Sequence, residues 1–96
     1  MKLGDLITLN TKDEEAEFWI TRRGSKKSVG KPSKEYNPES YGVHIKPEAK
    51  EIILPSYLFY VMQYLHGTGI FERMATGSTN LVNIRKRDIL SIPVRM

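Results

Sequence analysis

PSYLFYVMQYLHG, residues 55–67, is the stretch of this sequence with the clearest helical periodicity. Its apolar side chains recur at i, i+3, i+4 and i+7, the spacing of one helix face: Leu58, Val61, Met62 and Leu65. Pro55 suits the first turn, where a missing N–H is tolerated, and Gly67 is expected to end the helix. The pattern therefore predicts the main helix of the fold over 56–66. Three tyrosines flank the stripe and are expected to pack at its rim rather than stack on bases: Tyr57, Tyr60 and Tyr64.

The sequence before this helix indicates short strands. Residues 6–9 (LITL) and 18–21 (FWIT) are rich in the β-branched and aromatic side chains that strands favour. Residues 41–45 and 51–54 are two further candidates, and the turn between them is compatible with a hairpin. Residues 23–41 are rich in Gly, Pro, Ser and Lys. We expect them to form a long connection, most mobile over its inner part, because few large apolar side chains anchor it.

After the main helix the sequence indicates a second, short helix and two short strands. The helix is expected over 70–75, with Thr68 as its cap and Gly77 at its end. The strands are expected over 81–84 and 91–94, on either side of a basic turn. Together the segments predict an α+β fold: a small mixed sheet of short strands with one main helix and one short helix.

The composition fits one small domain spanning 1–96. Of its 96 residues, 40% are hydrophobic and 27% are charged, a globular balance. Cysteine is absent, which excludes disulfides and thiolate metal sites. No segment has the pattern of a signal peptide or a membrane span, so we expect a cytoplasmic protein without a membrane partner. We expect the core to include nine apolar side chains: Leu6, Trp19, Ile45, Ile53, Leu58, Val61, Leu65, Phe71 and Ile84.

The positive charge is concentrated in one stretch. The net charge is +4, and residues 22–34 hold six cations without an acid: Arg22, Arg23, Lys26, Lys27, Lys31 and Lys34. This stretch is either a solvated surface loop or a phosphate-contacting loop, whose glycines let backbone N–H groups approach an anion. A second basic cluster is either another phosphate patch or a solvated turn: Arg85, Lys86 and Arg87.

Motifs for catalysis and cofactors fail on their spacing. A P-loop needs four residues between its glycines and a hydroxyl after its lysine, whereas five residues separate Gly24 from Gly30 and a proline follows Lys31. His44 and His66 have no partner at metal-ligand spacing, and no serine lies in a Gly-x-Ser-x-Gly motif. We therefore expect no enzymatic activity, no catalytic residue, no metal and no cofactor.

Several blocks of the chain resemble a known family. The strongest blocks are residues 53–60 (ILPSYLFY), 75–79 (ATGST), 81–84 (LVNI) and 86–94 (KRDILSIPV). They resemble the C-terminal half of a target recognition domain from the specificity subunit of type I restriction–modification systems. That family has a helix with ilP-x-YL-x-Y, an A-x-Gly-Ser turn, an I-x-x-x-D-L segment and a closing I-P-L-P strand. Three upstream segments are similar to further elements of the family: 3–7 (LGDLI), 23–25 (RGS) and 29–31 (VGK).

The resemblance implies a non-enzymatic α+β module that reads duplex DNA from its loops. In such modules Lys and Arg neutralise phosphates, and a few polar side chains read base edges. The implied DNA contacts are the 22–34 loop, Ser78, Arg85 and Lys86. For Ser78 a purely structural turn is the alternative. Arg95 stands where the family has a proline, and the family's long partner-binding helix has no counterpart here. A second function stays open, namely a protein-interaction or regulatory factor that engages a restriction or other host complex without touching DNA.

Overall fold

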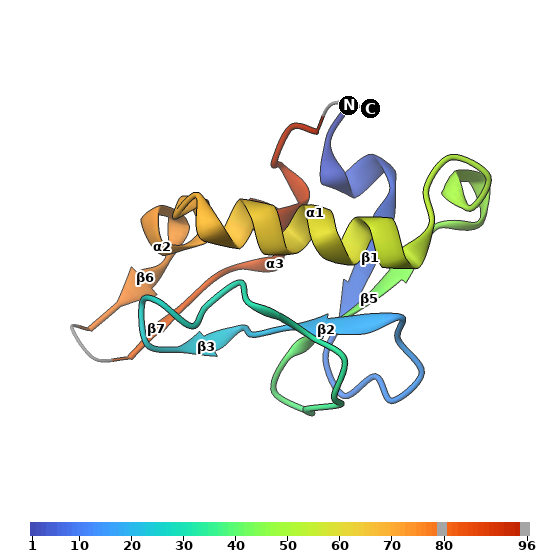
Figure 1. Ribbon diagram of the computed structural model, residues 1–96. Helices are drawn as coiled ribbons and strands as arrows, with labels where there is room; N and C mark the ends of the chain where they lie inside the picture. The colour runs from blue at the N-terminus through green and yellow to red at the C-terminus, as the bar shows by residue number, and fades with distance from the viewer. Residues whose placement is uncertain (79–80, 95–96) are drawn as a thin grey trace.

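The computed structural model describes residues 1–78 and 81–94 and has an α+β fold (Figure 1). Within these residues the α-helices are α1 (Pro55–Gly67), α2 (Ile70–Met74) and α3 (Lys86–Leu90). The strands are β1 (Ile7–Asn10), β2 (Phe18–Ile20), β3 (Arg23–Gly24), β4 (Pro32–Ser33), β5 (Tyr41–Ile45), β6 (Thr76–Gly77) and β7 (Val82–Asn83). Two 3₁₀ turns complete the described elements, η1 (Leu3–Asp5) and η2 (Pro47–Ala49). The expected fold class is confirmed.

The larger sheet has the strand order β1-β5-β2-β4, and its described pairs are antiparallel. Strand β1 alternates buried and exposed residues, as a strand with one face on the core should. Its Ile7 lies opposite Ile45 of β5, and Phe18 of β2 lies opposite Val43 on the other side of β5. Strand β5 is therefore central, although the expected hairpin paired it with residues 51–54.

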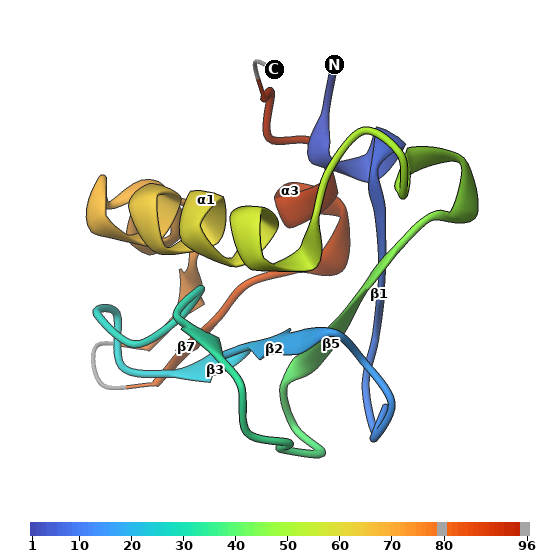
Figure 2. The ribbon, with the colours of Figure 1, turned by 45° about the vertical axis from the view of Figure 1, so that its right-hand side comes forward.

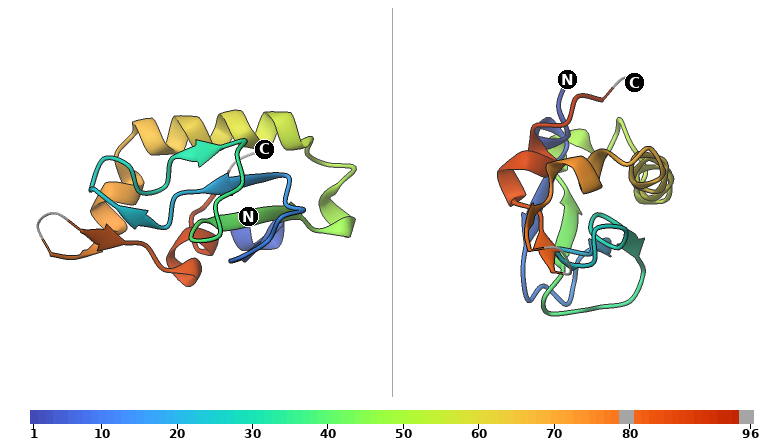
Figure 3. Two further views of the ribbon diagram at one scale, coloured as in Figure 1. Left: turned by 90° about the horizontal axis from the view of Figure 1, so that it is seen from below. Right: turned by 90° about the vertical axis from the view of Figure 1, so that its left-hand side faces the viewer.

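The smaller sheet has the order β3-β7-β6 and is also antiparallel. Its strands come from both halves of the chain, because Arg23 lies opposite Asn83 in the register. The strands thus form two antiparallel sheets in place of the single mixed sheet that was expected. Seen from below, this sheet lies at the same end of the molecule as α2 (Figure 3).

The helices cover one face of the strands and enclose the core (Figure 2). Leu58 and Met62 of α1 and Phe71 of α2 are fully buried there. Seven of the nine expected core side chains are buried. The other two, Val61 and Leu65, are only half-buried, because their side of α1 borders an open groove.

The acidic residues 13–17 lie next to the other face of the larger sheet. The indole N–H of Trp19 donates to the Asp13 carbonyl at 2.8 Å, and the Asp13 carboxylate pairs with His44 at 2.6 Å. A β-carbon on Gly42 of β5 would lie 2.8 Å from the β-carbon of Ala16. The glycine therefore lets this segment lie close against the sheet and cover Trp19.

Residues 51–54 are not a strand. Pro47 begins the 3₁₀ turn η2, and the chain then turns again, with the Ile53 N–H donating to the Ala49 carbonyl at 3.1 Å. Ile53 alone is buried, while Ile52 and Leu54 are exposed. A turn is enough to bury a single side chain of a continuous apolar run. The run 52–54 was therefore mistaken for a strand, although only Ile53 enters the core.

The C-terminal part also differs from expectation. Residues 86–90 form the helix α3 where a basic turn was predicted, with Arg85 extended at its N-cap. Residues 91–94 contribute one β-bridge, between Pro93 and Lys2, instead of a strand. The Leu3 N–H donates to the Ile92 carbonyl at 2.9 Å, so the two ends of the described chain lie side by side.

The helix boundaries around α2 differ from the expected ones by one residue, and the residues expected to flank α2 have other roles. Helix α1 continues through Gly67, and Gly69, at φ +83°, takes the left-handed conformation that begins α2. Thr68 was expected to cap α2, but its hydroxyl donates back to the Leu65 carbonyl at 2.6 Å. Gly77 lies in β6 and does not end the helix.

Candidate nucleic-acid interface

The pairing of β3 with β7 joins two basic stretches that are far apart in the sequence. Arg23 lies opposite Asn83, and the Ile84 N–H donates to the Arg22 carbonyl at 3.0 Å. Arg85 and Lys86 follow directly in the chain. The start of the 22–34 loop and the second basic cluster therefore form one surface, the basic corner, made of Arg22, Arg23, Arg85 and Lys86.

Three exposed polar side chains lie in one row across the smaller sheet. Arg23 of β3 and Thr76 of β6 both lie opposite Asn83 of the central β7. Directly opposed residues of antiparallel strands point to the same face, and all three residues are exposed. The other residue of β7, Val82, precedes Asn83, is buried and points to the core. We call Arg23, Asn83 and Thr76 the polar row.

Asn83 and Thr76 were not among the site residues expected from the sequence. Burial on either side of Asn83, at Val82 and Ile84, is the alternation that would have placed Asn83 on the outer face. No comparable pattern marks Thr76, because β6 has only two residues and both are exposed. Its place in the row follows from pairing alone.

Two cations of the basic corner are engaged within the protein. Arg22 forms an ion pair with Glu39 at 2.6 Å, donates to the Glu39 carbonyl at 2.8 Å, and lies 5.9 Å from the centre of the Tyr41 ring. Arg85 forms an ion pair with Asp88 at 3.0 Å. Arg23 and Lys86 form no ion pair with any residue among 1–78 and 81–94. They are the cations of the corner best placed to meet an external anion.

Lys26 and Lys27 are exposed on a short loop that is held on two helices. The Lys27 carbonyl lies 2.7 Å from Nε2 of His66 near the end of α1. Val29 is fully buried, and Gly30 packs against the Phe71 ring of α2. These contacts present both lysines at the helix side of β3. The expected mobility of residues 25–40 stays a prediction. The contacts of Lys27, Val29 and Gly30 lie inside this segment and hold part of it.

The remaining basic residues of the loop lie further along the chain. The Lys31 carbonyl accepts the Thr21 N–H at 3.0 Å, so Lys31 lies beside the end of β2. The ammonium of Lys34 lies 5.1 Å from the centre of the Phe59 ring, against the N-terminal half of α1. Lys34 is thus placed over α1, whereas the corner is built on β3 and β7.

Ser78 takes part in the turn between β6 and β7. Both its N–H, at 3.0 Å, and its hydroxyl, at 3.3 Å, donate to the Leu81 carbonyl. These bonds favour the structural interpretation of this residue. Thr79, the last residue of the expected turn, lies outside the described residues.

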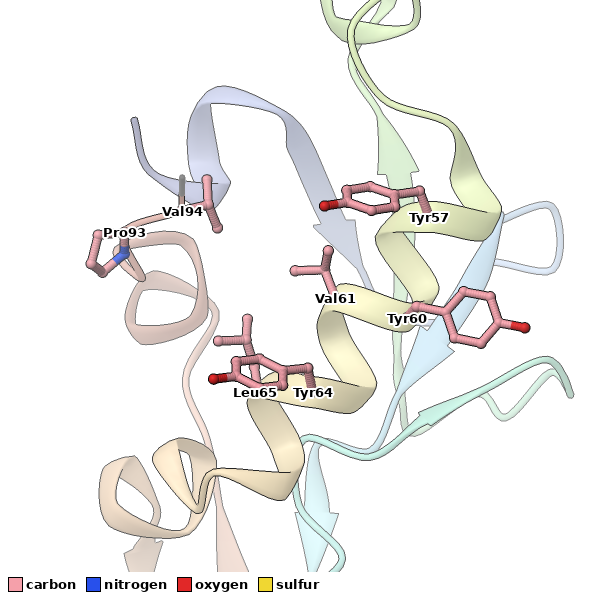
Figure 4. Close-up of a pocket in the computed structure, with 7 residues that line it drawn as sticks. All are labelled: Tyr57, Tyr60, Val61, Tyr64, Leu65, Pro93 and Val94. Atoms are coloured by element: carbon pink, nitrogen blue, oxygen red, sulfur yellow. The ribbon is translucent and has the colours of Figure 1, made fainter. Parts of the chain in front are cut away.

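A second exposed feature is a groove along α1, with a volume of about 440 Å³. Seven residues line it: Tyr57, Tyr60, Val61, Tyr64, Leu65, Pro93 and Val94. Tyr57 and Tyr64 point from the helix toward Pro93 and Val94, whereas Tyr60 points away from them (Figure 4). The three tyrosines are 55%, 67% and 72% exposed, so only part of each side chain is available to pack at the rim of the helix stripe.

The chain has no significant match among known protein families, curated proteins or solved structures. In the described part of the chain, no group of three acidic or histidine side chains is arranged to hold a metal ion. The helices described here are also too short or too polar to cross a membrane.

Proposed function

We propose that the protein is a cytoplasmic DNA-binding module without enzymatic activity, of the kind found as target recognition domains in type I specificity subunits. The observation that supports it best is the β3–β7 pairing. It gathers cations from residues 22–23 and 85–86 around a row of exposed polar side chains. Cations beside a hydrogen-bonding surface are what duplex recognition needs, because phosphate contacts position the protein and polar side chains face the bases.

In this proposal Lys26, Lys27 and Lys86 contact phosphates. Each contact releases a counterion, so affinity falls with salt by about 0.9 log units per contact for each log unit of salt. The acidic segment 13–17 covers the larger sheet at Trp19 and His44, so its charge is not interleaved with the basic corner. The sequence blocks shared with target recognition domains support the same assignment.

The test is a titration with random-sequence duplex DNA at about 50 and 200 mM salt. Replacing Lys26 and Lys27 by alanine should make the salt slope shallower by about two units if both contact phosphates. The matched control removes two lysines at the other end of the molecule, Lys46 and Lys50, which flank η2. An unchanged slope in the loop variant, or an equal change in both variants, contradicts the loop contact.

A second candidate function is protein interaction without DNA contact, within a restriction complex or another host complex. The groove along α1 favours it, because helix residues 55–65 carry no charge and present three exposed tyrosines. Such a face suits an apolar segment of a partner whose polar atoms bond to tyrosine hydroxyls. Failure of the parent protein to bind random duplex at about 50 mM salt would favour this function over the first.

A further inference from the structure

The polar row has the dimensions of a DNA groove. Neighbouring strands lie about 4.8 Å apart, so a row across three strands spans roughly 10 Å between its outer α-carbons. The major groove of B-form DNA is about 12 Å wide and is entered by β-ribbons as well as by helices. The smaller sheet of β3, β7 and β6 therefore fits with its exposed face toward the base pairs.

Among residues 1–78 and 81–94, the side chains of the row have no hydrogen-bond partner. Arg22, Arg85 and Ser78 each donate to a protein oxygen. In contrast, the side chains of Arg23, Asn83 and Thr76 are exposed and make no hydrogen bond with any other described residue. Three unengaged polar side chains in register on one face are not needed to hold the sheet together, and this frees them for a ligand.

The chemistry of the row matches base edges. An arginine guanidinium bonds to O6 and N7 of guanine, and an asparagine carboxamide bonds to N6 and N7 of adenine. A threonine offers a hydroxyl for hydrogen bonding and a methyl group that contacts the thymine methyl. Arg85 lies two residues after Asn83, the middle residue of the row, and brings a cation beside the row, where a flanking phosphate would lie.

We propose that Arg23, Asn83 and Thr76 enter the major groove of B-form DNA and read base edges there. This inference rests on the proposed function and adds the site of sequence discrimination. A-form duplexes differ, because their major groove is too deep and narrow for side chains to read. The row should therefore discriminate between DNA sequences and also between duplex DNA and duplex RNA.

The experiment is selection of bound sequences from a pool of duplex DNA with a randomised centre. The parent protein should enrich a short sequence that combines a G·C pair, for Arg23, with a neighbouring A·T pair, for Asn83. Asn83→Ala should bind that sequence roughly tenfold more weakly, with affinity for random duplex and salt slope unchanged. Arg23→Lys keeps the charge and loses the two-pronged contact, so it should lose discrimination in the same way. Asn10→Ala, at an exposed end of β1, is the matched control and should behave as the parent.

Each outcome separates this inference from the proposed function. Binding to random duplex without enrichment of any sequence overturns base reading and leaves the DNA-binding function standing. Equal losses for Asn83→Ala and Asn10→Ala overturn the assignment to the row, and Arg23→Lys tests it again if the asparagine variant unfolds. Equal affinity for duplex RNA of the enriched sequence overturns the major-groove placement. Absence of duplex binding refutes the proposed function and this inference with it.

Discussion

Gly30 lies so close to the ring of Phe71 that a β-carbon at position 30 would stand 2.1 Å from the Phe71 Cγ atom. The glycine also has φ +84°, a conformation that other residues rarely adopt. The contact holds the basic loop on α2, and with it the positions of Lys26 and Lys27.

We expect Gly30→Ala to destabilise the protein by at least about 2 kcal/mol, because overpacking and backbone strain act together. Thermal unfolding followed by circular dichroism measures the effect. The control is Gly67→Ala, since a β-carbon there meets no atom within 4 Å and alanine favours a helix. That variant should be as stable as the parent or slightly more stable. Equal melting temperatures for the two variants would contradict the close contact.

Leu58→Ala tests the phase of α1. Leu58 is 0% exposed, so its truncation leaves a cavity and should lower the free energy of unfolding by about 2–5 kcal/mol. Leu54→Ala removes the same atoms from a side chain that is 65% exposed, and should change stability by less than about 0.5 kcal/mol. Chemical denaturation of both variants gives the comparison. A mild effect at Leu58 would mean that another face of α1 lies on the core.

Amide hydrogen exchange tests the predicted mobility of residues 25–40. We expect most of these amides to exchange faster than those of residues 57–65 in α1, because few buried side chains hold the segment. The Gly30 amide should be an exception, since it donates to the Thr21 carbonyl at 2.8 Å next to the buried Val29. Protection as strong over 34–39 as in α1 would refute the prediction.

Glu39→Gln tests whether Arg22 is held back from DNA by its ion pair. Loss of the carboxylate at 2.6 Å leaves the Arg22 guanidinium in place on the residue 39 carbonyl and the Tyr41 ring but removes the charge that neutralises it. Affinity for random duplex should therefore rise, and the salt slope should steepen by about one unit. Stability should change by at most about 1 kcal/mol, because Glu39 is exposed. Glu48→Gln in η2 removes the same charge away from the corner. An identical effect on binding at both positions would show that net charge alone is responsible.

Much of the fold could be predicted because its signals are local. The helix α1 follows from four apolar residues at helical spacing, and β1, β2 and β5 follow from β-branched and aromatic runs. The apolar run 51–54 misled the prediction, since a short run of this kind is buried equally well by a strand or by a single turn side chain. The cations of the candidate site could be identified in the sequence, but the sequence did not show that they lie together in the structure.

The amino-acid sequence by itself determined the α+β class, the main helix and the concentration of positive charge over residues 22–34, because periodicity and composition act within a few residues. Only the tertiary structure decided that Arg23 lies beside Asn83 and Thr76, and that Arg85 and Lys86 join the same surface. Strands β3, β6 and β7 have two residues each, too few for a pattern of alternation. Their register depends on burial of Val82 between the sheet and the helices, an interaction between parts of the chain that are distant in sequence.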